Sequence, residues 1–279
     1  MADPVAAIAV AAKFGLSLTG LLAIGLTLNA ALFAELRAST FWRPMTIGFA
    51  LLAAIFAAVG FALQAVTLTG ELAGMADPEI LGLLWRTQAG EALLLRLLGF
   101  GLIAASPLFS RIGLVPALIG GAMSIWSFAS VGHVSDQPFY AQAALSLHLS
   151  IAAFWLGILL PLWRAAPAKA AVLGRQFGRV ALWLVPLLFV AGLALAATLV
   201  GGLDGLATPY GLALLIKVAL AAILLGLGAL NKFRLIPALD LTPVQSKTRL
   251  NRSLATEAAV FCLILLGTAW FTSSLSPPA

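Results

Sequence analysis

Two histidines and one methionine are the residues of this sequence best suited to bind a transition metal. The histidines are His133 and His148, and imidazole nitrogen is a common copper ligand while thioether sulfur favours Cu(I). His133 lies just before a tight turn centred on Asp136, and His148 lies twelve residues after that centre on a predicted helix. Counting back thirteen residues from Asp136 reaches Met123, so an antiparallel hairpin would place Met123 and His148 at similar depth. We predict that His133, His148 and Met123 bind a metal ion; helix contacts by the histidines and packing by the methionine are the alternative.

Arg96 and Lys217 are cations within long apolar stretches, where an ionisable side chain is a candidate functional group. Each lies about 12 Å from the outer end of its predicted helix at 1.5 Å per residue. Such a charge must reach the interface, pair with an acid or contact an anionic ligand. Glu91, five residues before Arg96, and Asp204, just outside the Lys217 helix, are the predicted partners. Structural ion pairs and contact with a ligand are both open as roles for these cations.

The two cations belong to a pattern that occurs twice. Thr87-Gln-Ala-Gly90 precedes Arg96, and Thr208-Pro-Tyr-Gly211 precedes Lys217 at the same spacing, 121 residues later. Threonine is a good N-cap, so each copy is predicted to begin a helix. Because both helices enter from the same side, the pattern favours a parallel repeat of two related halves. Chance similarity between two apolar helix starts is the alternative.

Acidic side chains concentrate in segments that are predicted to lie on the outer side of the protein. The acids that we expect to attract a metal ion are Glu71, Asp136 and Asp204. Clustered charge of one sign raises the local concentration of ions of the opposite sign. We therefore predict that these carboxylates draw cations towards the mouth of the metal site.

The composition indicates that these residues belong to a membrane protein. Of the 279 residues, 62% are hydrophobic and only 9% are charged, whereas soluble domains have roughly 45–50% apolar and about 25% charged residues. This excludes a soluble enzyme and a nucleic-acid-binding domain, and one cysteine cannot form an internal disulfide. We predict an all-α polytopic membrane protein.

Eight apolar stretches are long enough to approach the roughly 20 residues that a spanning helix needs. They cover residues 6–33, 45–70, 88–108, 113–133, 140–163, 178–203, 209–230 and 254–275. The linker 71–87 is predicted to hold a short helix in the membrane interface, and 231–253 to form a basic loop. With no room for a soluble domain, residues 1–279 are expected to form one transmembrane domain of eight helices.

The basic residues predict the orientation. With the N-terminus outside, twelve lysines and arginines fall in cytoplasmic loops and one, Arg86, falls in an outer loop. Positive residues concentrate on the cytoplasmic side of membrane proteins, so both termini are expected to be periplasmic. The N-terminus lacks a basic region and a cleavage site, so the first helix is expected to be a retained span.

The chain resembles the copper resistance protein D family of bacterial inner-membrane proteins. The resemblance is strongest over residues 133–279, where Trp155 follows His148 at seven residues and Thr208 and Tyr210 belong to the second Thr-x-x-Gly pattern. Asn231 and the segment Arg252–Glu257 also contribute. The resemblance implies about eight spans, copper movement across the inner membrane and a periplasmic copper-binding partner. It implies supporting roles for Trp155, Thr208 and Tyr210.

The leading hypothesis is therefore copper transport from the periplasm to the cytoplasm without ATP, with copper ion as the bound metal. We expect no nucleic-acid partner, because of the composition, and no enzymatic activity. No phosphate-binding loop, nucleophile elbow or HExxH motif is present to support ATP-driven pumping or metalloprotease chemistry. The alternative is a haem b protein in electron transfer or assembly, with His133 and His148 as axial ligands and Arg96 and Lys217 near the propionates. A structural partner of a copper enzyme is a third, weaker interpretation.

Overall fold

The computed structural model describes residues 4–132, 134–202 and 204–275, and the regular elements of this part of the chain are helices. Within these described ranges, seven helices are long and apolar enough to cross a membrane. In chain order these are α1 (Pro4–Leu32), α3 (Trp42–Thr69), α5 (Gln88–Ala105), α7 (Phe139–Arg164), α8 (Pro167–Val200), α9 (Pro209–Leu230) and α11 (Pro243–Ser274). The protein is thus an all-α polytopic membrane protein, as its composition predicts.

The predicted span 113–133 corresponds to a shorter apolar helix, α6 (Leu114–Ala129), of 16 residues. At 1.5 Å per residue this helix is about 24 Å long, less than the roughly 30 Å hydrocarbon core of a bilayer. The residues before it form a 3₁₀ segment, η2 (Ser106–Ile112). The count of eight spans stays a prediction, while the described part of the chain contains seven long apolar helices and one short one.

The linker 71–87 contains the short helix expected there. A 3₁₀ turn, η1 (Leu72–Ala76), is followed by α4 (Pro78–Trp85). Asp77 caps α4, because its Oδ1 accepts hydrogen bonds from the backbone N–H of Glu79 at 2.9 Å and of Ile80 at 3.3 Å. Pro78 occupies the first turn, where its missing N–H costs nothing.

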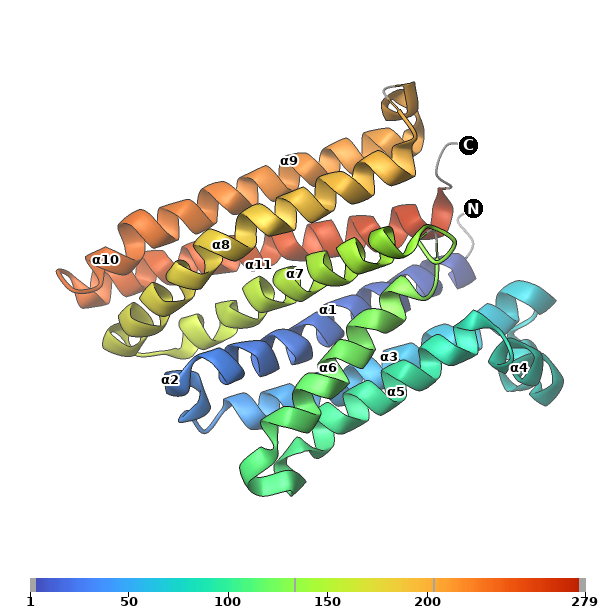
Figure 1. Cartoon of the computed structure of the whole chain (residues 1–279), viewed down its shortest axis with the longest axis horizontal. Coiled ribbons are helices and arrows are strands. Elements are labelled where there is room, and N and C mark those ends of the chain that lie inside the picture. Colours follow the sequence, from blue (N-terminus) through green and yellow to red (C-terminus); the bar gives the residue numbers. More distant parts are fainter. Residues whose placement is uncertain (1–3, 133, 203, 276–279) are drawn as a thin grey trace.

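The helices form two sets of four that meet along α1 and α7. One set is α1, α3, α5 and α6, and the other is α7, α8, α9 and α11. Figure 1 shows α1 and α7 side by side in the middle, with α3, α5 and α6 beyond α1 and α8, α9 and α11 beyond α7. Each set contains one of the two Thr-x-x-Gly patterns, at the start of α5 and of α9, and the repeat of two related halves stays a prediction.

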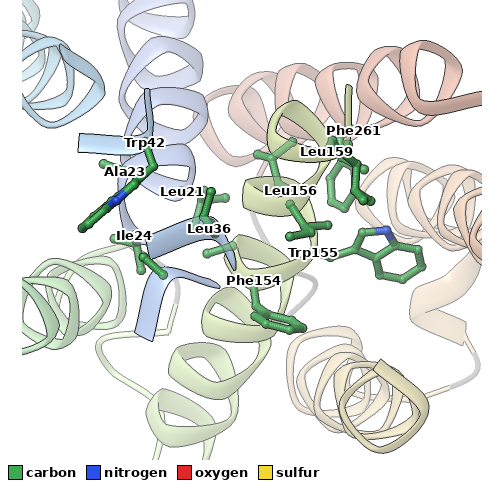
Figure 2. Packing of buried hydrophobic residues seen from close by; sticks show 14 of the residues in the cluster. Leu21, Ala23, Ile24, Leu36, Trp42, Phe154, Trp155, Leu156, Leu159 and Phe261 are labelled. Carbon is green, nitrogen blue, oxygen red and sulfur yellow. The ribbon is translucent and has the colours of Figure 1, made fainter. Parts of the chain in front are cut away.

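Small residues let the two central helices touch backbone to backbone. A Cβ added to Gly25 of α1 would collide with the backbone of Ala153, and one added to Gly157 of α7 would collide with the backbone of Gly25. Close approach through small residues is a common basis of helix packing in membranes. Figure 2 shows the surrounding core, in which Phe154 and Trp155 project from α7 in different directions.

The two ends of the bundle differ in composition. The first turn of α1, the last turn of α11 and α4 lie at one end, which we call the terminal end (Figure 1). The opposite end holds α2 (Ala34–Arg37), α10 (Ile236–Ala238) and the connection from α7 to α8. We call it the basic end, because the twelve lysines and arginines assigned to cytoplasmic loops belong to segments at this end.

Candidate functional site

His148 lies on α7 with one ring nitrogen fixed by the neighbouring helix. Its Nδ1 is 3.0 Å from the carbonyl oxygen of Leu188 on α8. A carbonyl only accepts hydrogen bonds, so Nδ1 carries the hydrogen and, in the neutral ring, Nε2 carries the lone pair. Metal-binding histidines commonly donate one ring N–H to a carbonyl while the other nitrogen binds the metal. The contact of His148 with Leu188 is thus of the kind that metal-binding histidines also make.

The surroundings of His148 come from three helices. Gly192 of α8 lies against the imidazole, since a Cβ built there would be 3.2 Å from His148 Cε1. Lys217 of α9 acts electrostatically on His148, so these two predicted residues lie in the same region of the second half. A cation beside the ring adds positive charge to the site, which a bound metal cation must tolerate.

A buried polar cluster lies further along the same face of α7. Trp155 is seven residues after His148, which corresponds to about 10 Å along a helix. Its Nε1 donates to Oε2 of Glu257 on α11 at 3.0 Å, and Nδ2 of Asn231 donates to Oε1 of the same carboxylate. Trp155, Glu257 and Asn231 are 5%, 1% and 8% exposed, respectively. The cluster joins three elements of the second half inside the membrane.

Asn231 owes its position to an irregular turn at the end of α9. Residues Asn231–Leu235 form a π-helix, η4, between α9 and α10. π-Helical turns are rare and frequently occur at functional sites. Here Asn231 contacts Glu257, while the adjacent Lys232 donates from Nζ to the carbonyl oxygen of Gly178 on α8 at 2.6 Å.

Glu257 is a functional candidate that the residue-by-residue analysis of the sequence missed. Its segment contributed only to the family resemblance, because the apolar stretch begins at 254 and places Glu257 at a membrane edge. In the structure α11 begins at Pro243, so Glu257 lies fourteen residues inside a 32-residue helix. One feature of the sequence could have marked Glu257 as a candidate: it is the one acidic residue after Asp240.

The two Thr-x-x-Gly patterns have the same local structure. Thr87 Oγ1 accepts from the N–H of Ala89 at 3.2 Å, and Thr208 Oγ1 accepts from the N–H of Gly211 at 3.1 Å. Gly90 and Gly211 each lie where a Cβ would collide with the backbone of the preceding segment. Thr208 and Tyr210 are thus helix-start residues, and Tyr210 packs edge-on against Phe271 with ring centroids 5.5 Å apart.

Arg96 contacts α6 rather than the predicted acid. Its Nε donates to Ser127 Oγ at 3.1 Å, its Nη2 donates to the Ser127 carbonyl oxygen at 3.3 Å, and its guanidinium lies over the Phe128 ring. Glu91 is exposed, and the described ranges contain no ion pair between these residues. The predicted pairing is wrong because residues five apart lie about 140° apart around a helix, unlike neighbours at three or four. Glu91 is therefore not a buried charge.

Lys217 likewise makes no ion pair with Asp204 within the described part of the chain. Asp204 begins a 3₁₀ turn, η3 (Asp204–Ala207), and is exposed. Lys13 of α1 lies near enough to Arg96 for the two positive charges to repel, and its Nζ donates to Ser273 Oγ at 3.4 Å. Lys13, Arg96 and Lys217 thus have no acidic partner in an ion pair among the described residues.

The structure does not gather all the predicted metal ligands. His133 lies outside the described residues, and Met123 is half-buried on α6, which packs against α7. Glu71 and Asp136 are exposed in separate connections. Across residues 4–132, 134–202 and 204–275 no group of three or more His, Cys, Asp or Glu side chains could hold a metal ion.

Comparison with known proteins identifies relatives over most of the chain. Residues 171–271 match the family described as copper resistance protein D, and residues 1–138 match the family described as copper resistance protein D-like, N-terminal domain. The first helical set lies within the second of these matches, and α9 with most of α8 and of α11 lies within the first. No solved structure matches the chain.

A curated relative gives the same indication. The copper transport protein CutJ of Bacillus subtilis (strain 168) is 33% identical over 141 residues. The matched region covers 47% of this chain and 25% of that relative. The similarity thus spans about a quarter of the relative's length.

Proposed function

Because this chain belongs to the copper resistance protein D family, we propose that it moves copper across the bacterial inner membrane, from the periplasm to the cytoplasm, without ATP. The observation that carries the proposal is the hydrogen bond that holds the His148 ring. Its Nδ1 is bound to the Leu188 carbonyl at 3.0 Å, which leaves Nε2 to bind a metal ion inside the membrane. A histidine held in this way is suited to a copper ion in transit.

The charge distribution supports a periplasmic terminal end. Lysines and arginines concentrate in segments at the basic end, and such residues concentrate on the cytoplasmic side of membranes. The terminal end instead carries exposed acids in separate connections, including Glu71, Asp136 and Asp204. These acids attract copper towards the entrance, and His133 and Met123 complete the proposed path with His148.

Copper entry in this direction needs no nucleotide. A cation that moves into the cytoplasm follows the membrane potential, which supplies about 2.3 kcal/mol per charge at 100 mV. The sequence has no phosphate-binding loop. The membrane potential and the copper gradient are therefore the proposed sources of energy.

A periplasmic copper-binding protein is the proposed partner. The acids at the terminal end do not form a cluster that could hold a metal within the described part of the chain. A partner that holds copper tightly and releases it at the acidic entrance would supply the ion at low free concentration. The proposed contact surface is the terminal end near Asp136.

Haem b is a second candidate cofactor, because two observations suit an anionic ligand with histidine ligation. His148 has the carbonyl-bound Nδ1 that also orients axial haem ligands. Arg96 and Lys217 have no acidic partner among the described residues, so they are available to pair with propionates. In this case the protein would transfer electrons or assist assembly rather than move copper.

Elemental analysis of the detergent-purified protein distinguishes these functions. We expect copper bound to the wild-type chain after incubation with Cu(I) and removal of free metal, and much less in His148→Gln. Glu79→Gln, which changes an exposed residue of α4, is the control and should keep its copper. Stoichiometric iron with a haem absorption spectrum would instead support the second candidate and contradict the first.

A further inference from the structure

Glu257 is a carboxylate inside the membrane without a cationic partner. It is 1% exposed on α11, and the ion pair found in the described ranges joins Arg175 to Asp240 at the basic end. A charged side chain away from water is costly unless another charge, a proton or a metal ion compensates it. Some positive species is therefore expected to neutralise Glu257 in at least one state of the protein.

The hydrogen bonds around Glu257 favour a proton over a metal ion. Its two oxygens accept from Trp155 Nε1 and from Asn231 Nδ2. An indole N–H can donate but not accept, so Trp155 presents positive charge towards Oε2 and would repel a cation there. A proton on the other oxygen is compatible with this contact, because Oε2 continues to accept from the indole.

Asn231 can serve both protonation states of Glu257. Its Oδ1 is buried without a hydrogen-bond partner in the described part of the chain, and so is Oγ of Ser253, one turn before Glu257 on α11. An amide carries a donor and an acceptor on one planar group. With Nδ2 towards Glu257 it binds the carboxylate; after rotation of the amide, Oδ1 accepts from the carboxylic acid O–H.

The charged residues on the surrounding elements leave Glu257 without a counter-ion. Two cations near the basic end bind carbonyl oxygens instead: Lys232 Nζ binds Gly178, and Lys247 Nζ binds Leu162 at 2.5 Å. The other titratable or charged residues on α11 and on the elements packed against it are Lys13, Tyr140, His148, Arg164, Lys169, Arg175, Arg179, Tyr210, Lys217, Arg234, Arg249, Arg252 and Cys262. None of these described residues forms an ion pair with Glu257.

A cavity at the basic end is lined in part by the residue that follows Asn231. A cavity of about 490 Å³ at the basic end is lined by residues of α8 together with Lys232 and Ile236. Lys232 directly follows Asn231 in the π-helix. Because Asn231 contacts Glu257, we take this cavity as the place where a proton released from Glu257 reaches water.

We propose that Glu257 is a proton-binding site within the membrane, that Asn231 is its hydrogen-bond partner in both protonation states, and that copper binding at His148 displaces its proton. The last step rests on the proposed function. Copper at His148 brings positive charge about 10 Å from Trp155 along α7, and this charge favours the carboxylate. The Glu257 O–H bond breaks and the proton passes to water in the basic-end cavity. The positive charge of the copper ion then takes the place of the positive charge of the proton.

Infrared difference spectroscopy of the full-length protein in detergent tests the proton site without copper. We expect a carbonyl-stretch band of a protonated carboxyl group that Glu257→Gln removes and that the control Glu79→Gln keeps. Asn231→Leu retains the carboxyl group but changes its hydrogen bond, so the band should shift in that variant. This shift assigns the band to Glu257 even where Glu257→Gln does not fold. A wild-type spectrum without such a band at any pH from 5 to 8, roughly the range of greatest protein stability, would overturn the proposal.

Proton release during copper binding tests the coupling. Addition of Cu(I) to weakly buffered wild-type protein should release about one proton more per bound ion than the same addition to Glu257→Gln. Equal release from the two proteins, with copper bound to both, would overturn the coupling and leave the proposed function intact. Failure of the wild-type protein to bind copper would instead contradict the proposed function, and the infrared band then decides on the proton site alone.

Discussion

Trp155 and Glu257, 102 positions apart in the sequence, are joined by a hydrogen bond of 3.0 Å from the indole Nε1 to the carboxylate Oε2. The bond connects α7, which packs against α1 at the centre of the bundle, to α11 in the second set of helices. Trp155 also contacts α9, because a Cβ on Gly228 would lie 2.8 Å from its Cζ2. One side chain therefore fixes three helices around the buried carboxylate.

Removal of this hydrogen bond should destabilise the protein. Trp155→Phe keeps an aromatic ring but leaves Glu257 Oε2 without its donor, which we expect to cost about 1–3 kcal/mol. Thermal unfolding in detergent measures the change. Trp163→Phe, at an exposed position on the same helix, should leave the melting temperature close to wild type. An equal melting temperature for Trp155→Phe would show that the bond contributes nothing.

The glycine contact between α1 and α7 should tolerate no side chain. Gly157→Leu forces side-chain atoms into the backbone of Gly25, and overpacking of this kind costs about 1–3 kcal/mol or more. We expect a large loss of monodisperse protein in size-exclusion chromatography. Gly48→Leu is the control, since nothing lies within 4 Å of a Cβ there. Similar yields of the two variants would argue against close packing of the central helices.

Arg96 is expected to hold α5 against α6. Arg96→Met removes both hydrogen bonds to Ser127, so the folded yield should fall, and Ser127→Ala should reproduce part of the loss by removing one of them. Fluorescence-detected size-exclusion chromatography measures the yields. Normal yield together with lost copper or haem binding would contradict this structural role and assign Arg96 to a ligand.

The proposed orientation predicts which positions an impermeant thiol reagent can reach. In a Cys262→Ser background, a cysteine at Leu72 should be labelled from the periplasmic side of intact cells with a permeable outer membrane. A cysteine at Leu241 should be labelled only after lysis. Both positions are exposed, so accessibility to the reagent depends on the side of the membrane. The reverse pattern would place both termini in the cytoplasm.

Local sequence signals predicted the helix starts well and the side-chain partners poorly. Thr87 and Thr208 cap their helices as predicted, because a cap depends on residues within one turn. The pairing of Arg96 with Glu91 failed because the choice of partner depends on which helix packs alongside, and α6 supplies Ser127. Such contacts between distant segments leave no local trace in one sequence.

The basic segment 231–253 shows a second limit of the sequence. Its polar composition predicted a loop, but η4, α10 and the first turns of α11 make most of it helical. This continuation carries Asn231 and Glu257 into contact. Hydropathy marks where a helix enters lipid rather than where its backbone begins, and for this reason the buried carboxylate was overlooked.

Copper uptake into proteoliposomes that contain only this protein tests the central claim most directly. With Cu(I) outside, an inside-negative potential and no nucleotide, the wild-type protein should accumulate copper, and His148→Gln should reduce the rate about tenfold or more, the range seen when a metal ligand's environment is altered. Tyr140→Phe, an exposed change on the same helix, should transport as wild type does. Wild-type uptake no faster than in empty vesicles, or full uptake by His148→Gln, would contradict copper transport through His148.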